Sequence, residues 1–174
     1  EIRKILSGFR MSINISQVQA SKSDVIQDIS AEMKRTGLPL EAVIVELTES
    51  DLLEQNINEK HFLTELKRMG ISLALDDFGT GYSNFHYLSE LKPEIIKIDR
   101  SFTAKAVADE QEYYLQNQFC TMIHNLDMKI CIEGIESAQE WLKIRKLCPE
   151  FTQGYFWGKP CGYEEFVRKF VQEK

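Results

Sequence analysis

The sequence predicts an α/β fold, a parallel β-sheet covered by helices, in the form of a (β/α)8 barrel that lacks its first strands. Six apolar segments of strand length are each followed by a helix or a helical turn, and such alternation is typical of parallel sheets. The segments are apolar along nearly their whole length, as expected for strands buried on both faces. The 174 residues fit one domain. An open, doubly wound sheet fits these observations equally well.

In the first half of the chain we expect three strands and two helices. Each helix is followed by a glycine, Gly37 or Gly70, which favours a left-handed end, and Ser21 with Asp24 has the spacing of a capping box before the first helix. The expected strands are residues 10–16, 42–49 and 71–75, and the expected helices are residues 24–36 and 58–69.

The second half continues the alternation of strand and helix without a hairpin or a low-complexity linker. The expected strands are residues 94–98, 128–133 and 151–156, and the expected helices are residues 85–91, 103–125, 138–147 and 163–171.

Polar residues at the strand ends favour the barrel over the open sheet. A barrel brings the carboxyl ends of all its strands to one rim, where the active site lies, whereas an open sheet gathers its ligands at a single switch point. We therefore expect one site built from several strands. The residues at or next to the ends are Asn14, Glu46, Asp76 with Asp77, Lys97, Glu133 and Gln153.

The carboxylates in this set indicate a metal site. Carboxylates packed closely raise one another's pKa unless cations neutralise them, and hard oxygen ligands select Mg²⁺ or Mn²⁺. Adjacent acids such as Asp76 and Asp77 can bridge two ions, as two-metal phosphoryl chemistry requires. Lys97 could stabilise the attacking water or a phosphate oxygen, and Glu133 could accept the proton of that water.

Each residue also has a purely structural alternative. The pair Asp76 and Asp77 could cap the following loop, and Lys97 could pair with a neighbouring acid such as Asp99. Asn14 could serve a turn, and Glu49 could interact favourably with a helix dipole. The functional interpretation depends on the occurrence of all these residues together at the strand ends, which no single structural alternative explains.

Composition excludes some classes of partner. The net charge of −6 argues against bulk binding of long nucleic acid or anionic lipid, and no apolar run approaches the roughly 18 residues of a membrane span. The four cysteines contain no CxxC pair, so we expect reduced thiols and a cytoplasmic location.

The motifs together resemble the EAL domain family of cyclic-di-GMP phosphodiesterases over essentially the whole chain. Those that carry the resemblance are SINIS, VELTES, DDFGTGYSN, IKIDRSF, CIEGIES and TQGYFWGKP. The resemblance implies a barrel that hydrolyses cyclic-di-GMP to pGpG in bacterial signalling, with two Mg²⁺ or Mn²⁺ ions.

The resemblance also implies a role for each site residue. It makes Asn14, Glu46, Asp76 and Asp77 metal ligands, with Glu133 near the second ion, directly or through water. It makes Lys97, Glu133, Gln153 and Glu49 catalytic residues, with Glu49 anchoring the DDFGTGYSN loop. It places Glu136 and Pro160 in contact with the dinucleotide. It further implies a homodimer through the loop after Asp77 and fused or partner sensory or GGDEF domains.

One departure from the family pattern sets the expected domain boundaries. The Glu-x-Leu motif that names the family should lie well upstream of Asn14, and the 13 residues before Asn14 do not contain it. We expect residues 1–174 to be the C-terminal portion of a single EAL domain rather than a truncated, degenerate one. An inactive EAL-like receptor or interaction module is the main alternative function, and an unrelated Mg²⁺-dependent, enolase-like barrel is a more distant one.

Overall fold

The fold is a curved, fully parallel sheet of six strands in the sequential order β1-β2-β3-β4-β5-β6, which confirms the predicted fold class. The computed structural model describes residues 8–22, 24–48, 57–80, 88 and 91–172, without the side chains of residues 57–59 and 172. The strands are β1 (Met11–Asn14), β2 (Val43–Thr48), β3 (Ser72–Phe78), β4 (Ile95–Ile98), β5 (Lys129–Ile132) and β6 (Phe151–Thr152).

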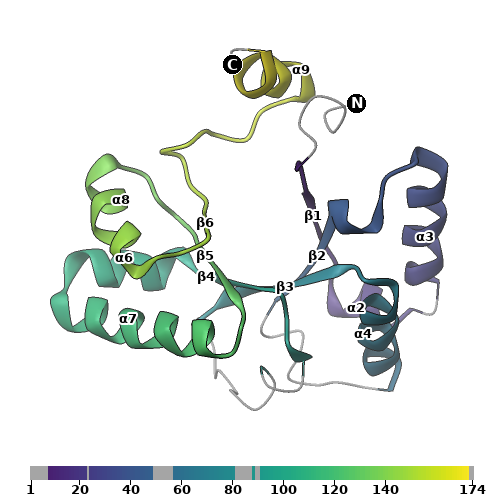
Figure 1. The fold of residues 1–174 in the computed structure, drawn as a ribbon, viewed down its shortest axis with the longest axis horizontal. Helices are drawn as coiled ribbons and strands as arrows, with labels where there is room; N and C mark the ends of the chain where they lie inside the picture. Colours follow the sequence, from purple (N-terminus) through teal and green to yellow (C-terminus); the bar gives the residue numbers. More distant parts are fainter. Residues whose placement is uncertain (1–7, 23, 49–56, 81–87, 89–90, 173–174) are drawn as a thin grey trace.

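The helices cover the convex side of this sheet, so the arrangement is that of an open half-barrel (Figure 1). The helices on the β1–β3 side are α2 (Gln17–Ala20), α3 (Val25–Thr36) and α4 (Ile57–Met69), and those on the β4–β6 side are α6 (Arg100–Ala108), α7 (Glu110–Asn125) and α8 (Ala138–Ile144). The last helix, α9 (Tyr163–Val167), lies across the open side, where Phe166 packs edge-on against Phe9 with ring centroids 5.8 Å apart.

Two apolar layers lie on opposite faces of the sheet because side chains alternate along a strand. The larger core fills the space between the sheet and the helices and includes Val45, Ile96, Ile98 and Ile132. A small inner layer consists of Ile44, Ala74, Ile95 and Cys131. The inner layer therefore supports the side chains that follow it along the strands, at their carboxyl ends.

An ionic network joins the amino ends of four strands. Glu94, just before β4, accepts hydrogen bonds from Arg10 at 2.9 and 3.1 Å, from Lys129 at 2.9 Å and from Ser72. The bond from Arg10, supported by those from Ser72 and Lys129, outweighs the effect of burial and lowers the pKa of Glu94 to about 2. Because Arg10 precedes β1, the network holds the curvature of the sheet from β1 to β5.

Loss of this network defines a first prediction, which concerns stability at acid pH. A carboxyl group with a lowered folded-state pKa stabilises the fold above its unfolded value of 4.5, and that contribution disappears as the pH falls toward about 2. We expect Glu94→Gln to lower the free energy of unfolding at pH 7 by about 1 to 2 kcal/mol, a figure reduced for the screening of a group one third exposed. Urea unfolding of both proteins between pH 7 and pH 2 measures this.

The difference between the two proteins should shrink toward zero at the acid end. Glu164→Gln, at an exposed position in α9, is the matched control and should show no such trend. A pH-independent difference for Glu94→Gln would contradict the ionic explanation.

The prediction of a single helix over residues 103–125 is wrong, because the structure has two helices there. Asp109 lies between α6 and α7 in an extended conformation, and its side chain accepts hydrogen bonds from the backbone N–H groups of Gln111 and Glu112 at 2.7 and 3.0 Å. This N-cap starts a new helix and so ends the previous one.

Other differences concern the ends of elements. The expected capping box at Ser21 is wrong. Asp24 is the N-cap of α3 without a side-chain bond, while Ser16 and Gln19 form a capping box for α2, a helix that the sequence pattern did not predict.

Strand β3 is longer than expected and β6 is shorter. The 3₁₀ turn η3 (Arg145–Leu147) and the π turn η4 (Arg168–Gln172) end the last two helical segments. A further 3₁₀ turn, η1 (Leu40–Ala42), precedes β2, and most of the helix expected at residues 85–91 lies outside the described residues.

Two expectations about the environment of the chain can be compared with the structure. All four cysteines are free thiols. Among the described residues, none of the helices combines the length and the apolar composition that a membrane crossing needs.

Candidate active site at the carboxyl ends of the strands

The centre of the site is the ammonium group of Lys97, which lies among three carboxylates. Its Nζ is 2.8 Å from Asp76 Oδ1, 2.9 Å from Glu46 Oε2 and 2.9 Å from Glu133 Oε1. The three acids come from β3, from β2 and from the residue after β5, and Lys97 itself is on β4. Four strands therefore deliver their functional groups to one point, as a barrel rim does.

Burial makes these contacts strong. Lys97 is 6% exposed and Glu46 8% exposed, so the charges interact with little screening by water. Burial alone would lower the pKa of Lys97, but its hydrogen bonds to the three carboxylates outweigh this and raise the pKa, so the lysine stays charged. A buried charge of this kind is retained only when it is paired and hydrogen-bonded.

The same environment affects the acids. Burial raises the pKa of Glu133, and the negative charges of Asp76 and Glu46 add to this effect, while Lys97 opposes it. Burial also raises the pKa of Asp77, reinforced by Asp76 and Asp99. The protein thus holds more negative charge here than one lysine neutralises, which favours an additional cation.

An irregularity in β3 brings Asp76 and Asp77 to the same side. In a regular strand consecutive side chains point to opposite faces. Here the pairing of β3 with β4 shifts register between Leu75 and Phe78, and Asp77 has a positive φ of 54°. One oxygen from each of Asp76, Asp77 and Glu133 consequently lies within 4.8 Å of the others.

This cluster differs from the expected ligand set in one respect. Glu46 was expected to share a metal site with Asp76 and Asp77, but it is not one of the three clustered acids and instead contacts Lys97. Glu133, which the family resemblance places near the second metal ion as well as in the role of base, is the third member of the cluster. Lys97 therefore links Glu46 to the cluster.

Asn14 and Gln153 flank the centre from the two outer strands. Asn14, the last residue of β1, is exposed and pairs in register with Glu46 on β2. Gln153 follows β6 and lines, with Glu46 and Lys97, a cavity of about 370 Å³ on the concave side of the sheet. The described part of the chain shows no hydrogen bond between the Asn14 side chain and these carboxylates.

Glycines allow the loops at this end of the barrel to pack closely. Gly134 has φ of 75°, and a Cβ there would collide with Arg100. Gly154, with φ of 156°, approaches the backbone of Ile135 so closely that a Cβ has no space. These contacts fix the backbone directly after Glu133 and directly after Gln153.

The expected substrate contacts lie at the edge of the site. Glu136 is exposed and forms an ion pair of 2.9 Å with Arg100 on α6, a residue that the sequence motifs did not single out. Pro160 lines a cleft of about 490 Å³ together with Gln153 and aromatic residues that include Tyr155 and Trp157. Glu49 lies outside the described residues.

The donor set of the cluster fits a divalent metal ion. Three carboxylates within 4.8 Å supply hard oxygen ligands, with neither thiol nor imidazole among them, and such ligands suit Mg²⁺, Mn²⁺ or Ca²⁺ better than zinc. Asn14 and Glu46 add two further oxygen donors on the neighbouring strands.

The fold and the site together define a β/α-barrel domain with an acidic site at the carboxyl ends of its strands. The family model described as "EAL domain" matches residues 1–160. The chain belongs to the EAL domain family, as its motifs indicated.

Relatives and solved structures agree with this assignment. The chain is 31% identical over 165 residues to cyclic di-GMP phosphodiesterase NbdA of Pseudomonas aeruginosa, covering 92% of this chain and 21% of that protein. It matches the EAL enzyme Bd1971 bound to cAMP and cyclic-di-GMP with a TM-score of 0.88 and 28% identity, covering 96% and 47% of the two chains. It matches Klebsiella pneumoniae BlrP1 in a manganese and cyclic-di-GMP complex with a TM-score of 0.79 and 25% identity, covering 90% and 40%. The chain thus spans about a fifth of the length of NbdA and under half of these solved chains.

Proposed function

We propose that the chain supplies the larger part of the catalytic site of a cyclic-di-GMP phosphodiesterase that forms pGpG. The observation that carries the proposal is the cluster of Asp76, Asp77 and Glu133 at the barrel rim, where Asp76 and Glu133 also contact Lys97. The relationship to NbdA supports the substrate, since that protein is named as a cyclic-di-GMP phosphodiesterase.

The proposed metal ligands are Asn14, Glu46, Asp76 and Asp77, with Glu133 close enough to contribute. Two Mg²⁺ or Mn²⁺ ions, when bound, would polarise the phosphodiester and lower the pKa of a water. The manganese complex of BlrP1 supports the metal type. Asp77 would supply its carboxylate through the register shift that turns it toward Asp76.

Lys97 and Glu133 would act on the attacking water. Three carboxylates hold the Lys97 ammonium at the rim and use all three of its N–H donors, so it would orient a water or a phosphate oxygen once one of these carboxylates turned to a metal ion. Glu133 would receive the proton of that water. Its raised pKa moves it toward the range in which a carboxylate is an effective base near neutral pH.

Gln153, Glu136 and Pro160 would bind the water network and the dinucleotide. Gln153 lies between the concave cavity and the cleft that contains Pro160, so a substrate in that cleft would reach toward Lys97. Glu136 is held by Arg100 and could accept a hydrogen bond from a base edge.

Three further parts of the proposal concern the assembly. A homodimer through the loop after Asp77 stays a prediction, because residues 81–87 lie outside the described part of the chain. Additional sensory or GGDEF domains are consistent with the small share of NbdA that the chain spans. The cytoplasmic location also stays a prediction.

The test is an assay, for both metal binding and hydrolysis, of this chain joined to an upstream segment that carries the Glu-x-Leu motif. We expect Mn²⁺ to bind, measured by electron paramagnetic resonance, and cyclic-di-GMP to be converted to pGpG, measured by chromatography, with EDTA stopping the reaction. Hydrolysis that continues in EDTA would overturn the metal mechanism. Binding of cyclic-di-GMP and Mn²⁺ without formation of pGpG would replace the enzyme by a receptor.

A further inference from the structure

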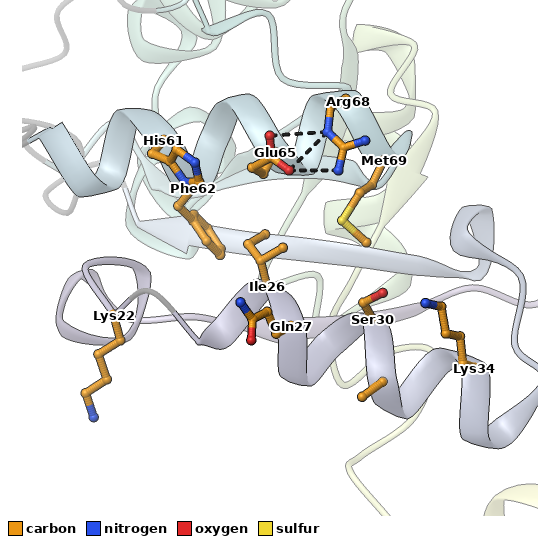
Figure 2. A pocket seen from close by; sticks show the side chains of 11 residues that line it. Lys22, Ile26, Gln27, Ser30, Lys34, His61, Phe62, Glu65, Arg68 and Met69 are labelled. Carbon is orange, nitrogen blue, oxygen red and sulfur yellow. Dashed lines mark hydrogen bonds and ion pairs between the residues drawn. The ribbon is translucent and has the colours of Figure 1, made fainter.

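The outer surface of the barrel has a groove between α3 and α4 that is separate from the carboxylate site. We call it the α3–α4 groove. It has a volume of about 550 Å³, and neither helix contributes a residue to the cluster around Lys97. Figure 2 shows that side chains from both helices point into the space between them.

The floor of the groove is partly apolar, with Gln27 and Ser30 beside the apolar residues. Ile26 of α3 and Phe62 and Met69 of α4 lie along it, with the ring of Phe62 directed toward Ile26 (Figure 2). Phe62 is buried, whereas Ile26 and Met69 are half-buried, so part of their apolar surface is open to a partner. The spacing from Phe62 to Met69 corresponds to two helical turns, about 10 Å.

The rim of the groove is positively charged, although the chain as a whole carries a net charge of −6. Lys22 and Lys34 lie toward opposite ends of the groove and form no ion pair with another described residue (Figure 2). On the α4 side, Arg68 is paired with Glu65 at 2.9 Å, so these two charges offset each other. The remaining positive charge comes from the two lysines.

From this combination we propose that the α3–α4 groove binds an acidic amphipathic helix of a partner protein. The apolar stripe of such a helix would cover the exposed parts of Ile26 and Met69, and acidic residues on its flanks would meet Lys34 and, once its side chain turns inward, Lys22. This is the helix-in-groove mode of recognition, in which anchors spaced three and four residues apart enter an apolar trough. Helices α3 and α4, of 12 and 13 residues, match a partner helix of about 15 residues.

The positive charge at the rim of the groove favours a partner helix with acidic flanks over a neutral or basic helix. A basic helix would bring like charges to both ends of the groove, which disfavours association. The groove is also a trough between two helices rather than an enclosed pocket, so it presents an extended apolar strip of the kind a helix can cover. The site proposed for hydrolysis takes no part in this inference.

The probe is a designed helical peptide of about 15 residues with leucines at helical spacing on one face and glutamates on both flanks. We expect it to bind the purified protein in fluorescence anisotropy, and we expect the amide shifts that it causes in NMR spectra to fall on α3 and α4. Raising the salt concentration from about 50 mM to about 500 mM should weaken binding, because the rim charges are exposed.

A charge exchange gives the decisive comparison. Lys34→Glu is expected to weaken binding about tenfold and to improve binding of a second peptide in which lysines replace the glutamates. Lys146→Glu, at an exposed lysine outside the groove, is the matched control and should bind like the unchanged protein. Both variants should bind Mn²⁺ normally, so failure here is distinguishable from failure of the proposed hydrolysis.

Four outcomes of the peptide experiments would overturn the proposal. They are no binding at about 1 mM peptide, the weak limit of specific association; equal binding of the acidic and basic peptides; shifts located away from α3 and α4; or equal loss of binding in Lys34→Glu and Lys146→Glu. Inorganic pyrophosphate serves as a second probe. If it shifted the amides of α3 and α4 and the acidic peptide did not, the proposal would be overturned in favour of a small anion. The chain could instead form a dimer whose amide shifts fall on the groove. That result would replace the partner helix by a second copy of the chain.

Discussion

Replacing Asp76 with asparagine is expected to lower the rate of cyclic-di-GMP hydrolysis at least a hundredfold while leaving the protein folded. Asp76, like Glu133, belongs both to the carboxylate cluster and to the contacts of Lys97. An amide keeps the size of the side chain but removes the negative charge that two bridged metal ions require. A hundredfold loss corresponds to a barrier higher by about 2.7 kcal/mol.

Metal binding provides a second readout for the same variant. We expect the Mn²⁺ affinity of Asp76→Asn to fall, as seen by electron paramagnetic resonance, while circular dichroism and the unfolding midpoint stay close to those of the unchanged protein. Asp127→Asn is the control, because Asp127 is exposed, lies in a turn at the other end of β5 and has a positive φ that asparagine tolerates. If Asp76→Asn kept more than about a tenth of the original turnover, its proposed bridging role would be wrong.

The fold could be predicted from the sequence because its signals are local. Uninterrupted apolar strands, glycines after helices and polar residues at strand ends all agree, and sequences in which each level agrees specify one topology. The same pattern correctly predicts that Glu46, Lys97 and Glu133 meet at one rim. The helix break at Asp109 was also visible in principle, since aspartate is a strong N-cap, but apolar periodicity on both sides concealed it.

The details of the site could not be predicted because they depend on geometry between strands. The sequence does not show that β3 shifts register after Leu75, and only this shift brings Asp77 beside Asp76. It also does not show that Lys97 contacts three acids at once, since the neighbouring Asp99 was an equally good partner on sequence grounds. In the structure Asp99 instead caps α6 through the backbone N–H of Ser101.

The second large effect is expected for Lys97→Met, which removes the central charge but keeps much of the side-chain volume. In the metal-free protein we expect a loss of about 3 to 5 kcal/mol in the free energy of unfolding, because breaking a buried ion pair leaves the opposite charges uncompensated. Three carboxylates lose their partner here. Hydrolysis should also be lost, since the group that orients the water is absent.

Divalent metal should reverse part of this loss of stability. A ligand that binds only the folded state adds about 2.7 kcal/mol when its concentration is a hundred times its Kd. Because Mn²⁺ would supply positive charge to the same carboxylates, we expect it to stabilise Lys97→Met more than the unchanged protein. Chemical denaturation with and without Mn²⁺ measures this, and Lys146→Met, at an exposed lysine, should show no such difference.

The pH dependence of the same variant separates a charge effect from a packing effect. Burial already raises the pKa of Glu133 above its ordinary value of 4.5, and removal of Lys97 takes away the positive charge that opposes this rise. A carboxyl group with a raised folded-state pKa destabilises the fold above that pKa, and the destabilisation disappears as the pH falls to the unfolded value. The deficit of Lys97→Met should therefore be largest at neutral pH and shrink toward pH 4.5. A deficit that stays constant over this range, and that Mn²⁺ does not change, would mean that Lys97 contributes through packing alone and that the acids around it do not form a charged cluster.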